Sequence, residues 1–232
     1  MVKGGPIVRR AYLDRVLGRL LPARAGIPAE YGRALAQRNA ALRHTAAGLS
    51  SLPAVAPWTE TLAALGTKLD AARAEAVAAL SEPFTDVAGA LGLAHASLDY
   101  DARGLSVPDL EERLGRDLAH GTTGAGPHLR DLSIRAGTRD LRAFGSQGEQ
   151  RIAVLSLLLA EARVIGDRHG EAPVLLLDDV LSELDDRRRG ALLEGVPAGC
   201  QTLVTATTLR SLPPGLTPDL VVDVMPGRAV SR

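Results

Sequence analysis

Apolar residues recur at intervals of three and four positions along the first 80 residues, which is the spacing of one buried helix face. This spacing predicts helices over residues 8–21, 28–47 and 58–80, separated by turns that contain proline. The third stretch has the spacing of a coiled coil but is short, so we expect it to pack on the second as an antiparallel hairpin. The first part of the chain is therefore predicted to be helical.

From about residue 94 the pattern changes, because short apolar runs typical of strands alternate with helical stretches. We expect strands at residues 97–100, 174–177, 201–205 and 220–224, a hairpin at 132–141, and helices over 107–118, 147–165 and 187–193. The alternation over residues 145–225 predicts a parallel sheet with helices on its faces. The chain is thus expected to be α/β, with a mainly helical arm in residues 1–93 and an α/β portion in residues 94–232.

Two acidic residues, Asp178 and Asp179, follow the apolar run Val174–Leu177, which is typical of a buried strand. The carboxyl end of such a strand lies at the ligand-binding edge of an open α/β sheet. Adjacent carboxylates at this edge favour a functional role. On this run alone, a strand followed by an acidic turn is an equally good interpretation.

A second candidate site is the start of the apolar helix after Phe144. Ser146 is followed three positions later by Glu149, which fits a helix capping box. Ser146 and Gly148 at a helix start also suit an anion, because free backbone N–H groups and the helix dipole point outward there. The order of this start, the strand ending in two acids, and then Ser182–Asp185 is far more specific than any of the three alone.

Charge and cysteine content narrow the classes of function. Lys+Arg and Asp+Glu both number 27, yet residues 1–43 hold nine basic and two acidic side chains, a local net charge of +7. This segment could contact a polyanion, although a solvated helix surface explains it equally well. A single cysteine, Cys200, excludes a disulfide framework within the chain and suits a reducing compartment. We find no secretory signal and no apolar run of the roughly 18 residues that a membrane span needs.

The motifs resemble those of a known family. FGSQGEQRIAVLSLLLAEA (144–162) and PVLLLDDVLSELDD (173–186) are similar to the second half of an ABC-type ATPase head of the SMC-like group. With residues 3–17, 31–43 and 122–132 in the same order, the resemblance is closest to the RecF family of bacterial DNA recombination and repair proteins. It implies a P-loop NTPase head with an inserted helical arm, and it runs from Lys3 to at least Thr208.

This resemblance implies roles for individual residues. Asp178 matches the Walker B aspartate, which holds Mg²⁺ through its water shell, and Asp179 matches the catalytic carboxylate that polarises the attacking water. The resemblance places the signature motif at Ser146, Gln147, Gly148 and Gln150. In the family this motif contacts the γ-phosphate of ATP bound to the other subunit. Ser182–Asp185 match the D-loop at the dimer interface, with Asp185 as a nucleotide-site residue. Many ABC proteins carry a switch histidine where this chain has Thr205–Thr208.

The chain departs from the family pattern in one respect: its 232 residues contain no G-x-x-x-x-G-K-[ST] sequence. The resemblance implies a RecF-like chain without the segment that carries the P-loop, as a shortened gene or a fragment. The amides and lysine of that loop are the main cradle of the β- and γ-phosphates. We therefore expect weak ATP binding, or none, and no ATP hydrolysis by this chain alone.

The family further implies a cytoplasmic protein of DNA recombination, repair and replication, linked to DNA damage and the SOS response. Its expected partners are DNA with gaps or single-strand/double-strand junctions, a second copy joined through the ATPase head, recombination mediator proteins of the RecF pathway, and no membrane. ATP and Mg²⁺ are the implied cofactors. The expected DNA-facing residues are Lys3, Arg9, Arg10, Arg33 and Arg38.

Other functions remain open at this point. The chain could be an interaction module that supplies only the signature face to an intact subunit, or an inactive gene remnant. A different ABC-type ATPase, such as a transporter nucleotide-binding domain, is disfavoured by the helical arm, the Asp-Asp pair and the absent switch histidine. A metal-dependent nuclease using Asp178 and Asp179 needs further acidic ligands, which the sequence does not clearly supply.

Overall fold

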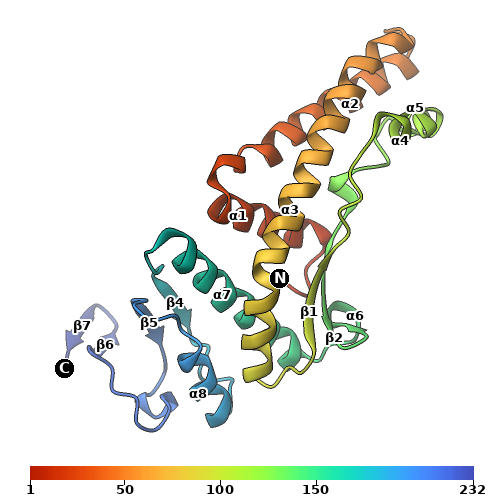
Figure 1. The fold of residues 1–232 in the computed structure, drawn as a ribbon. Helices are drawn as coiled ribbons and strands as arrows, with labels where there is room; N and C mark the ends of the chain where they lie inside the picture. Colours follow the sequence, from red (N-terminus) through yellow and green to blue (C-terminus); the bar gives the residue numbers. More distant parts are fainter.

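A computed structural model describes all 232 residues as a long, mostly helical molecule with three small sheets (Figure 1). The helices are α1 (Pro6–Leu20), α2 (Ile27–Ala46), α3 (Ala56–Ala90), α4 (Val107–Glu112), α5 (Leu114–His120), α6 (Leu141–Phe144), α7 (Gln147–His169) and α8 (Asp186–Glu194). The strands are β1 (Ala96–Tyr100), β2 (Leu132–Ala136), β3 (Arg139–Asp140), β4 (Leu175–Asp178), β5 (Thr202–Thr205), β6 (Val222–Met225) and β7 (Arg228–Ser231). Short 3₁₀ turns lie at Pro22–Arg24, Leu52–Val55, Pro127–Leu129 and Leu209–Ser211.

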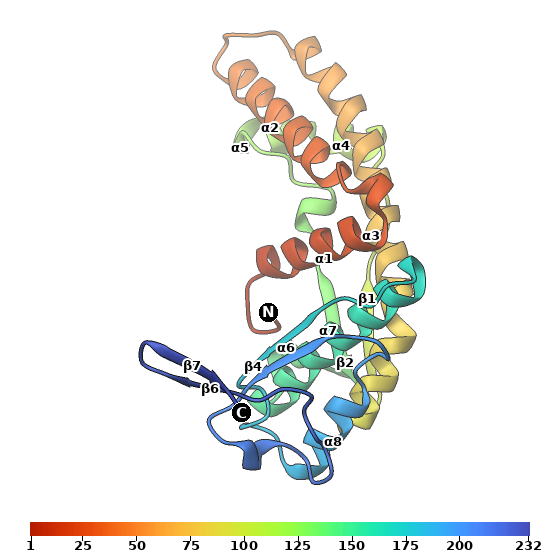
Figure 2. The same cartoon turned by 90° about the vertical axis from the view of Figure 1, so that its left-hand side faces the viewer.

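Helices α2 and α3 lie side by side at one end of the molecule, and the pair β4–β5 lies with α7 and α8 at the other (Figures 1 and 2). The predicted helical first part and the packing of the third helix on the second are confirmed. Helix α3 continues ten residues beyond the expected end at Leu80 and contains Pro83. Phe84 and Ala88 are fully buried in the core, so packing of this last part outweighs the hydrogen bond that proline removes.

Strands β1, β2 and β3 form an antiparallel sheet, with Leu98 opposite Ile134. The expected hairpin between β2 and β3 is confirmed and turns at Gly137, whose φ of 58° favours glycine. The expected helix over residues 107–118 is instead two short helices, α4 and α5, with Arg113 between them. Both helices lie in the long connection from β1 to β2, beside the far ends of α2 and α3 (Figure 1).

The parallel sheet expected in the last third of the chain is smaller than predicted. Strands β4 and β5 pair in parallel, with Asp178 opposite Thr205. The strand expected at 220–224 does not join them, because β6 pairs antiparallel with β7 through the Pro226-Gly227 turn. That part of the prediction was wrong, since Pro-Gly turns the chain back onto itself and makes a separate hairpin.

A single hydrophobic core runs from α1 to α8 and includes residues of both halves of the chain. Helix α3 spans it, packing on α2 at one end and on α7 at the other. The expected boundary near residue 93 therefore stays a prediction. Leu175 and Leu177 of β4 are buried, whereas Leu176 is 70% exposed and Leu203 of β5 is 50% exposed. The pair β4–β5 is thus covered by helices on one face only, not on both as predicted.

Arg38 lies in the interior of the arm, with none of its surface exposed. Its Nη1 donates to Asp117 Oδ2 and to Thr123 Oγ1, each at 2.8 Å, and its Nε donates to Thr59 Oγ1 at 3.1 Å. Asp117 Oδ1 in turn accepts from the amide of Gly124 at 3.0 Å. The expectation that Arg38 faces DNA was wrong, because its guanidinium is buried and joins α2 and α3 to α5 and the glycine-rich loop 121–126.

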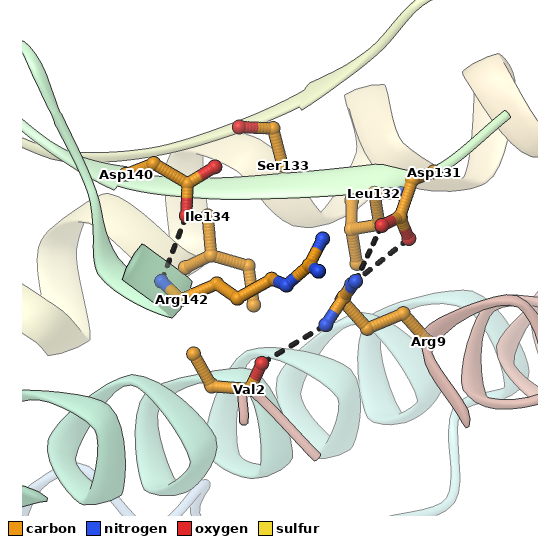
Figure 3. A pocket seen from close by; sticks show the side chains of 8 residues that line it. All are labelled: Val2, Arg9, Asp131, Leu132, Ser133, Ile134, Asp140 and Arg142. Atoms are coloured by element: carbon orange, nitrogen blue, oxygen red, sulfur yellow. Dashed lines mark hydrogen bonds and ion pairs between the residues drawn. The ribbon is translucent and has the colours of Figure 1, made fainter. Parts of the chain in front are cut away.

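Arg9 is the second expected DNA-facing residue that the fold buries, with 2% of its surface exposed. Its Nε donates to Asp131 Oδ1 at 2.9 Å, and its Nη1 donates to the carbonyl oxygen of Val2 at 2.9 Å (Figure 3). A second contact joins its Nη2 to Asp131 Oδ2. The expectation was wrong here too, because this arginine ties α1 and the start of the chain to the residue before β2.

Removing Arg38 should be far more costly than removing an exposed arginine. Arg38→Ala leaves the Asp117 carboxylate buried without its partner, and we expect a loss of roughly 3–5 kcal/mol in the free energy of unfolding. The control is Arg24→Ala, which breaks the exposed ion pair between Arg24 and Glu75 and should cost at most about 1 kcal/mol. Urea unfolding measures both, and equal losses would contradict the role given to Arg38.

His128 makes the stability of this network depend on pH. Its Nε2 donates to the carbonyl oxygen of Thr123 at 3.0 Å, so its Nδ1 accepts from the Tyr31 hydroxyl at 2.7 Å. Burial lowers the pKa of His128 in the folded protein, so the unfolded chain binds the proton more tightly.

We expect the free energy of unfolding to fall as the pH decreases through about 6.5, by at most about 1.4 kcal/mol per pH unit. His128→Gln should remove this part of the pH dependence. Urea unfolding at several pH values between about 7.5 and about 5.5 tests this expectation. Parallel pH profiles for the two proteins would refute it.

Candidate functional site

The start of α7 is fixed by the capping box predicted from the sequence. Ser146 Oγ accepts from the amide of Glu149 at 3.2 Å, and Glu149 Oε2 accepts from the amide of Ser146 at 2.8 Å. Glu149 Oε1 also accepts from Arg139 at 2.7 Å. The Arg139 guanidinium and the Ser146 amide lower the pKa of Glu149 to about 2. At neutral pH this carboxylate is therefore ionised and fixed at the first turn.

The outer face of this turn is open. Ser146, Gln147 and Gly148 are exposed, and no protein group accepts a hydrogen bond from the amides of Gln147 or Gly148. A Cβ atom added to Gly148 would meet only Ser146 Oγ, at 4.0 Å. Free amides at the positive end of a 23-residue helix form a surface that suits an anion. The structure thus brings these three predicted residues together on one exposed turn.

Gln150 lies behind the turn and is buried. Its Nε2 donates to the carbonyl oxygens of Leu141 and Gly145, at 2.8 and 3.1 Å. A Cβ atom on Gly145 would lie 2.5 Å from the Leu141 carbonyl oxygen, so only glycine fits there. Gln150 therefore holds the chain between α6 and α7 in place, and its side-chain amide does not lie on the exposed face where the sequence motif had suggested a ligand contact.

Asp178 and Asp179 lie at the end of β4, as predicted, and both are exposed. Thr205, at the end of β5, links them: its Oγ1 donates to Asp178 Oδ1 at 2.6 Å and accepts from the amide of Asp179 at 2.9 Å. Asp179 has a φ of 49°, a left-handed conformation that Asp tolerates better than most residues. The sequence drew attention to Thr205 only because many ABC proteins carry a switch histidine in this region. That observation does not predict the role of Thr205 in orienting the two acids.

One carboxylate oxygen of Asp178 has no protein partner, because only Oδ1 is hydrogen-bonded. A single carboxylate fits Mg²⁺ that keeps most of its waters and is held mainly by phosphate oxygens. It does not make a metal site by itself, and the structure contains no group of three or more His, Cys, Asp or Glu side chains that could hold a metal ion.

The segment after the two acids packs against the core and approaches α7. Ser182 Oγ donates to the carbonyl oxygen of Asp179 at 2.9 Å, which closes the turn. Asp185 caps α8, since its Oδ1 accepts from the amide of Arg188 at 2.9 Å. An ion pair between Arg151 and Glu183 joins α7 to this turn. This ion pair thus links the first turns of α7 to the acidic segment, which is remote from it in sequence.

The remaining basic candidates are Lys3, Arg10 and Arg33. Lys3 and Arg33 are exposed, and Arg10 is half-buried with its Nη1 donating to the carbonyl oxygen of Arg130 at 3.2 Å. Lys3 and Arg10 lie at the start of α1 and Arg33 lies on α2, so the structure does not gather them into one cluster. None of the helices is both long enough and apolar enough to traverse a bilayer.

No protein-family model matches the chain. Curated proteins named DNA replication and repair protein RecF are similar to it. The one from Heliobacterium modesticaldum is 35% identical over 228 residues, which is 92% of this chain and 61% of that protein. That from Anaeromyxobacter sp. strain K is 38% identical over 238 residues, covering 94% and 62%. The chain thus spans about three fifths of the length of these relatives.

Solved structures give the same picture. The recombination mediator protein RecF-ATPrS of the RecFOR pathway superposes with a TM-score of 0.83 at 26% identity, over 99% of this chain and 64% of that one. RecF-ATP superposes equally well, with a TM-score of 0.83 over the whole of this chain, and at 24% identity it supports the fold alone. The expected fold class, an ABC-type head portion with a helical arm, is confirmed.

The two glycines of the turn before and within α7 should respond differently to alanine. Gly145→Ala places a Cβ atom against backbone, so we expect a loss of roughly 1–3 kcal/mol in the free energy of unfolding. Gly148→Ala meets open space and adds helix propensity, so stability should change by less than about 1 kcal/mol, in the stabilising direction. Thermal and urea unfolding compare the two variants. A Gly148→Ala protein as unstable as Gly145→Ala would contradict the open geometry of this turn.

Proposed function

Because this chain belongs to the RecF family, we propose that it acts in DNA replication and repair and supplies the signature half of an ATP site shared between two subunits. The observation that carries the proposal is the exposed turn Ser146–Gly148, whose free amides face away from the protein. The amides of Gln147 and Gly148 form no hydrogen bond within the protein. It suits a phosphate group presented by another molecule.

In this proposal the ATP is bound first by the P-loop of a partner subunit. Phosphoryl transfer depends mainly on positioning and on electrostatic stabilisation of the phosphates. The amides of Gln147 and Gly148 would complete the binding of the γ-phosphate, while Ser146, Glu149 and Gln150 keep the turn rigid. Preorganised amides need no rearrangement as charge develops on the phosphate, which is the reason for such a rigid turn.

Asp178 and Asp179 are proposed as the acids of a second, equivalent site. Asp178, oriented by Thr205, would hold Mg²⁺ through water, and Asp179 would polarise the attacking water. Both roles require a P-loop beside them, and these 232 residues contain no such sequence. We therefore propose that the chain alone does not hydrolyse ATP and that its signature half is the part that functions.

We further propose that the chain binds DNA through phosphate contacts of Lys3, Arg10 and Arg33, without reading bases. These three side chains keep exposed surface and have no acidic partner within ion-pair distance, as is also true of Arg15 and Arg43 in the same segment, whereas Arg9, Arg19, Arg24 and Arg38 are paired with acids. Its proposed partners are gapped DNA and mediator proteins of the RecF pathway. Its proposed location is the cytoplasm, and its proposed cellular context is the SOS response. A head-to-head assembly with a second RecF-family subunit would place both halves of the ATP site together.

ATP turnover by a complementation pair tests the shared site. The partner is a full-length RecF-family subunit whose own signature glycine has been replaced, so that it lacks activity. Adding this chain should restore ATP turnover. Gly148→Asp should lower the restored ATP turnover roughly 100-fold, because its carboxylate repels the phosphate that the amides should bind. The variant should stay folded, since an acid at a helix N-terminus is favourable.

The matched control for this experiment is Asp179→Asn in the same chain. Its acid faces the site without a P-loop, so restoration should persist at the level of the unmodified chain. The proposal fails if Gly148→Asp restores turnover as well as the unmodified chain does. It fails equally if Asp179→Asn abolishes turnover.

The salt dependence of DNA binding tests the basic residues. We expect the triple variant Lys3→Gln, Arg10→Gln, Arg33→Gln to bind duplex DNA more weakly, with a slope of log K against log salt that is shallower by up to about three units. A control with the same loss of charge replaces Arg187, Arg210 and Arg228, which lie on the other half of the chain. Identical slopes for the two triple variants would exclude this DNA-facing set.

A further inference from the structure

A cavity of about 310 Å³ lies on the arm, between α4–α5 and the glycine-rich loop, and none of the residues considered so far as ligand-binding lines it. Four arginines converge on it: Arg103, Arg113, Arg116 and Arg130. Two acids, Asp109 and Glu112, also line it, which leaves a net charge of +2 on the lining side chains. Helices α4 and α5 lie beside the far ends of α2 and α3, at the opposite end of the molecule from β4 and β5 (Figure 1).

The four arginines are not equally available. Arg103 pairs with Asp101, and Arg130 pairs with the buried Asp70. No hydrogen bond or ion pair joins the side chains of Arg113 and Arg116 to any protein group, and the Nε of Arg113 is buried without a partner. A buried donor without an acceptor is costly in a folded protein, so the Arg113 guanidinium is not fully satisfied by protein groups.

The acids of the cavity do not neutralise these two arginines. Asp109 is occupied by its own capping box, where its Oδ2 accepts from the amide and from the hydroxyl of Ser106, at 2.9 and 2.6 Å. Glu112 forms no ion pair either, so no carboxylate is within ion-pair distance of Arg113 or Arg116. The free positive charge at the cavity therefore comes from these two guanidiniums.

The glycine-rich loop brings backbone close to Arg113. A Cβ atom on Gly124 would lie 2.6 Å from Arg113 Nη2, and one on Gly126, whose φ is 130°, would lie 2.5 Å from the Tyr31 hydroxyl. The φ of Gly126 favours glycine, whereas the flexible end of Arg113 could move away from a Cβ atom at Gly124. The Gly124 amide donates to Asp117, which also pairs with Arg38, so the buried network of the arm holds the loop beside the cavity in place.

We propose that this cavity binds a phosphate group, held by the guanidiniums of Arg113 and Arg116. Guanidinium groups match the planar, bidentate hydrogen bonding of phosphate oxygens, and two of them without an acidic partner leave their positive charge available to an anion. The phosphate comes either from the DNA backbone or from a free phosphate compound. The first source rests on the DNA binding proposed above, whereas the binding of phosphate itself does not.

Titration with inorganic phosphate, followed by the amide NMR signals of Ala125 and Gly126, tests the cavity directly. We expect saturable shifts in the unmodified chain, and binding at least about tenfold weaker in Arg113→Gln/Arg116→Gln. The control, Arg210→Gln/Arg228→Gln, carries the same loss of charge and should bind as the unmodified chain does. Arg116→Gln alone, at an exposed position, provides a variant that keeps the fold if Arg113→Gln does not.

The proposal is overturned if the unmodified chain shows no saturable shift, or if the cavity variants bind phosphate as tightly as the control. Where phosphate binds, adding duplex DNA separates the sources. Displacement of phosphate by DNA assigns the cavity to the DNA backbone, and binding that DNA leaves unchanged assigns it to a free phosphate compound. If the chain does not bind DNA at all, the proposed DNA binding fails while the phosphate titration still decides the cavity.

Discussion

The buried ion pair between Arg38 and Asp117 is the constraint on which the arm depends. Two charges taken out of water are costly unless each is paired and its remaining hydrogen-bonding groups are satisfied. Arg38 meets that condition through Asp117, Thr123 and Thr59, which lie on three different segments of the chain. The pair can form only when all three segments are in place, so it fixes α2, α3, α5 and the glycine-rich loop relative to one another.

That internal order contrasts with the open surfaces at the other end of the molecule. The turn Ser146–Gly148 presents unpaired amides, Asp178 presents a free carboxylate oxygen, and the pair β4–β5 leaves Leu176 and Leu203 exposed on one face. Parallel strands are normally buried on both faces. The buried polar groups thus pair with one another and stabilise the fold. The groups proposed to act on phosphate are exposed, where another molecule can reach them.

The sequence was sufficient for the features that local pattern controls. Helical spacing located α1, α2 and α7, and a capping motif located the start of α7. Local sequence pattern could not predict which arginines are exposed, because the acids that pair with the buried ones are remote in sequence. Arg38 and Asp117 are 79 positions apart, and Arg9 and Asp131 are 122 positions apart. The charge of a residue says nothing about the partner that folding brings to it. For the same reason the role of Thr205, which depends on the pairing of β5 with β4, was not predictable.

Native-state hydrogen exchange tests most directly the claim that one buried network holds the arm rigid while the phosphate-facing turn stays open. The amide of Thr123 donates to Asn39 Oδ1, and the amide of Gly124 donates to Asp117 Oδ1. Both amides should therefore exchange only through global unfolding, as slowly as the core of α3. The amides of Gln147 and Gly148 should exchange close to the rate of an unstructured peptide. Fast exchange at Thr123 and Gly124, or protection at Gln147 and Gly148 equal to that of the core, would contradict this account.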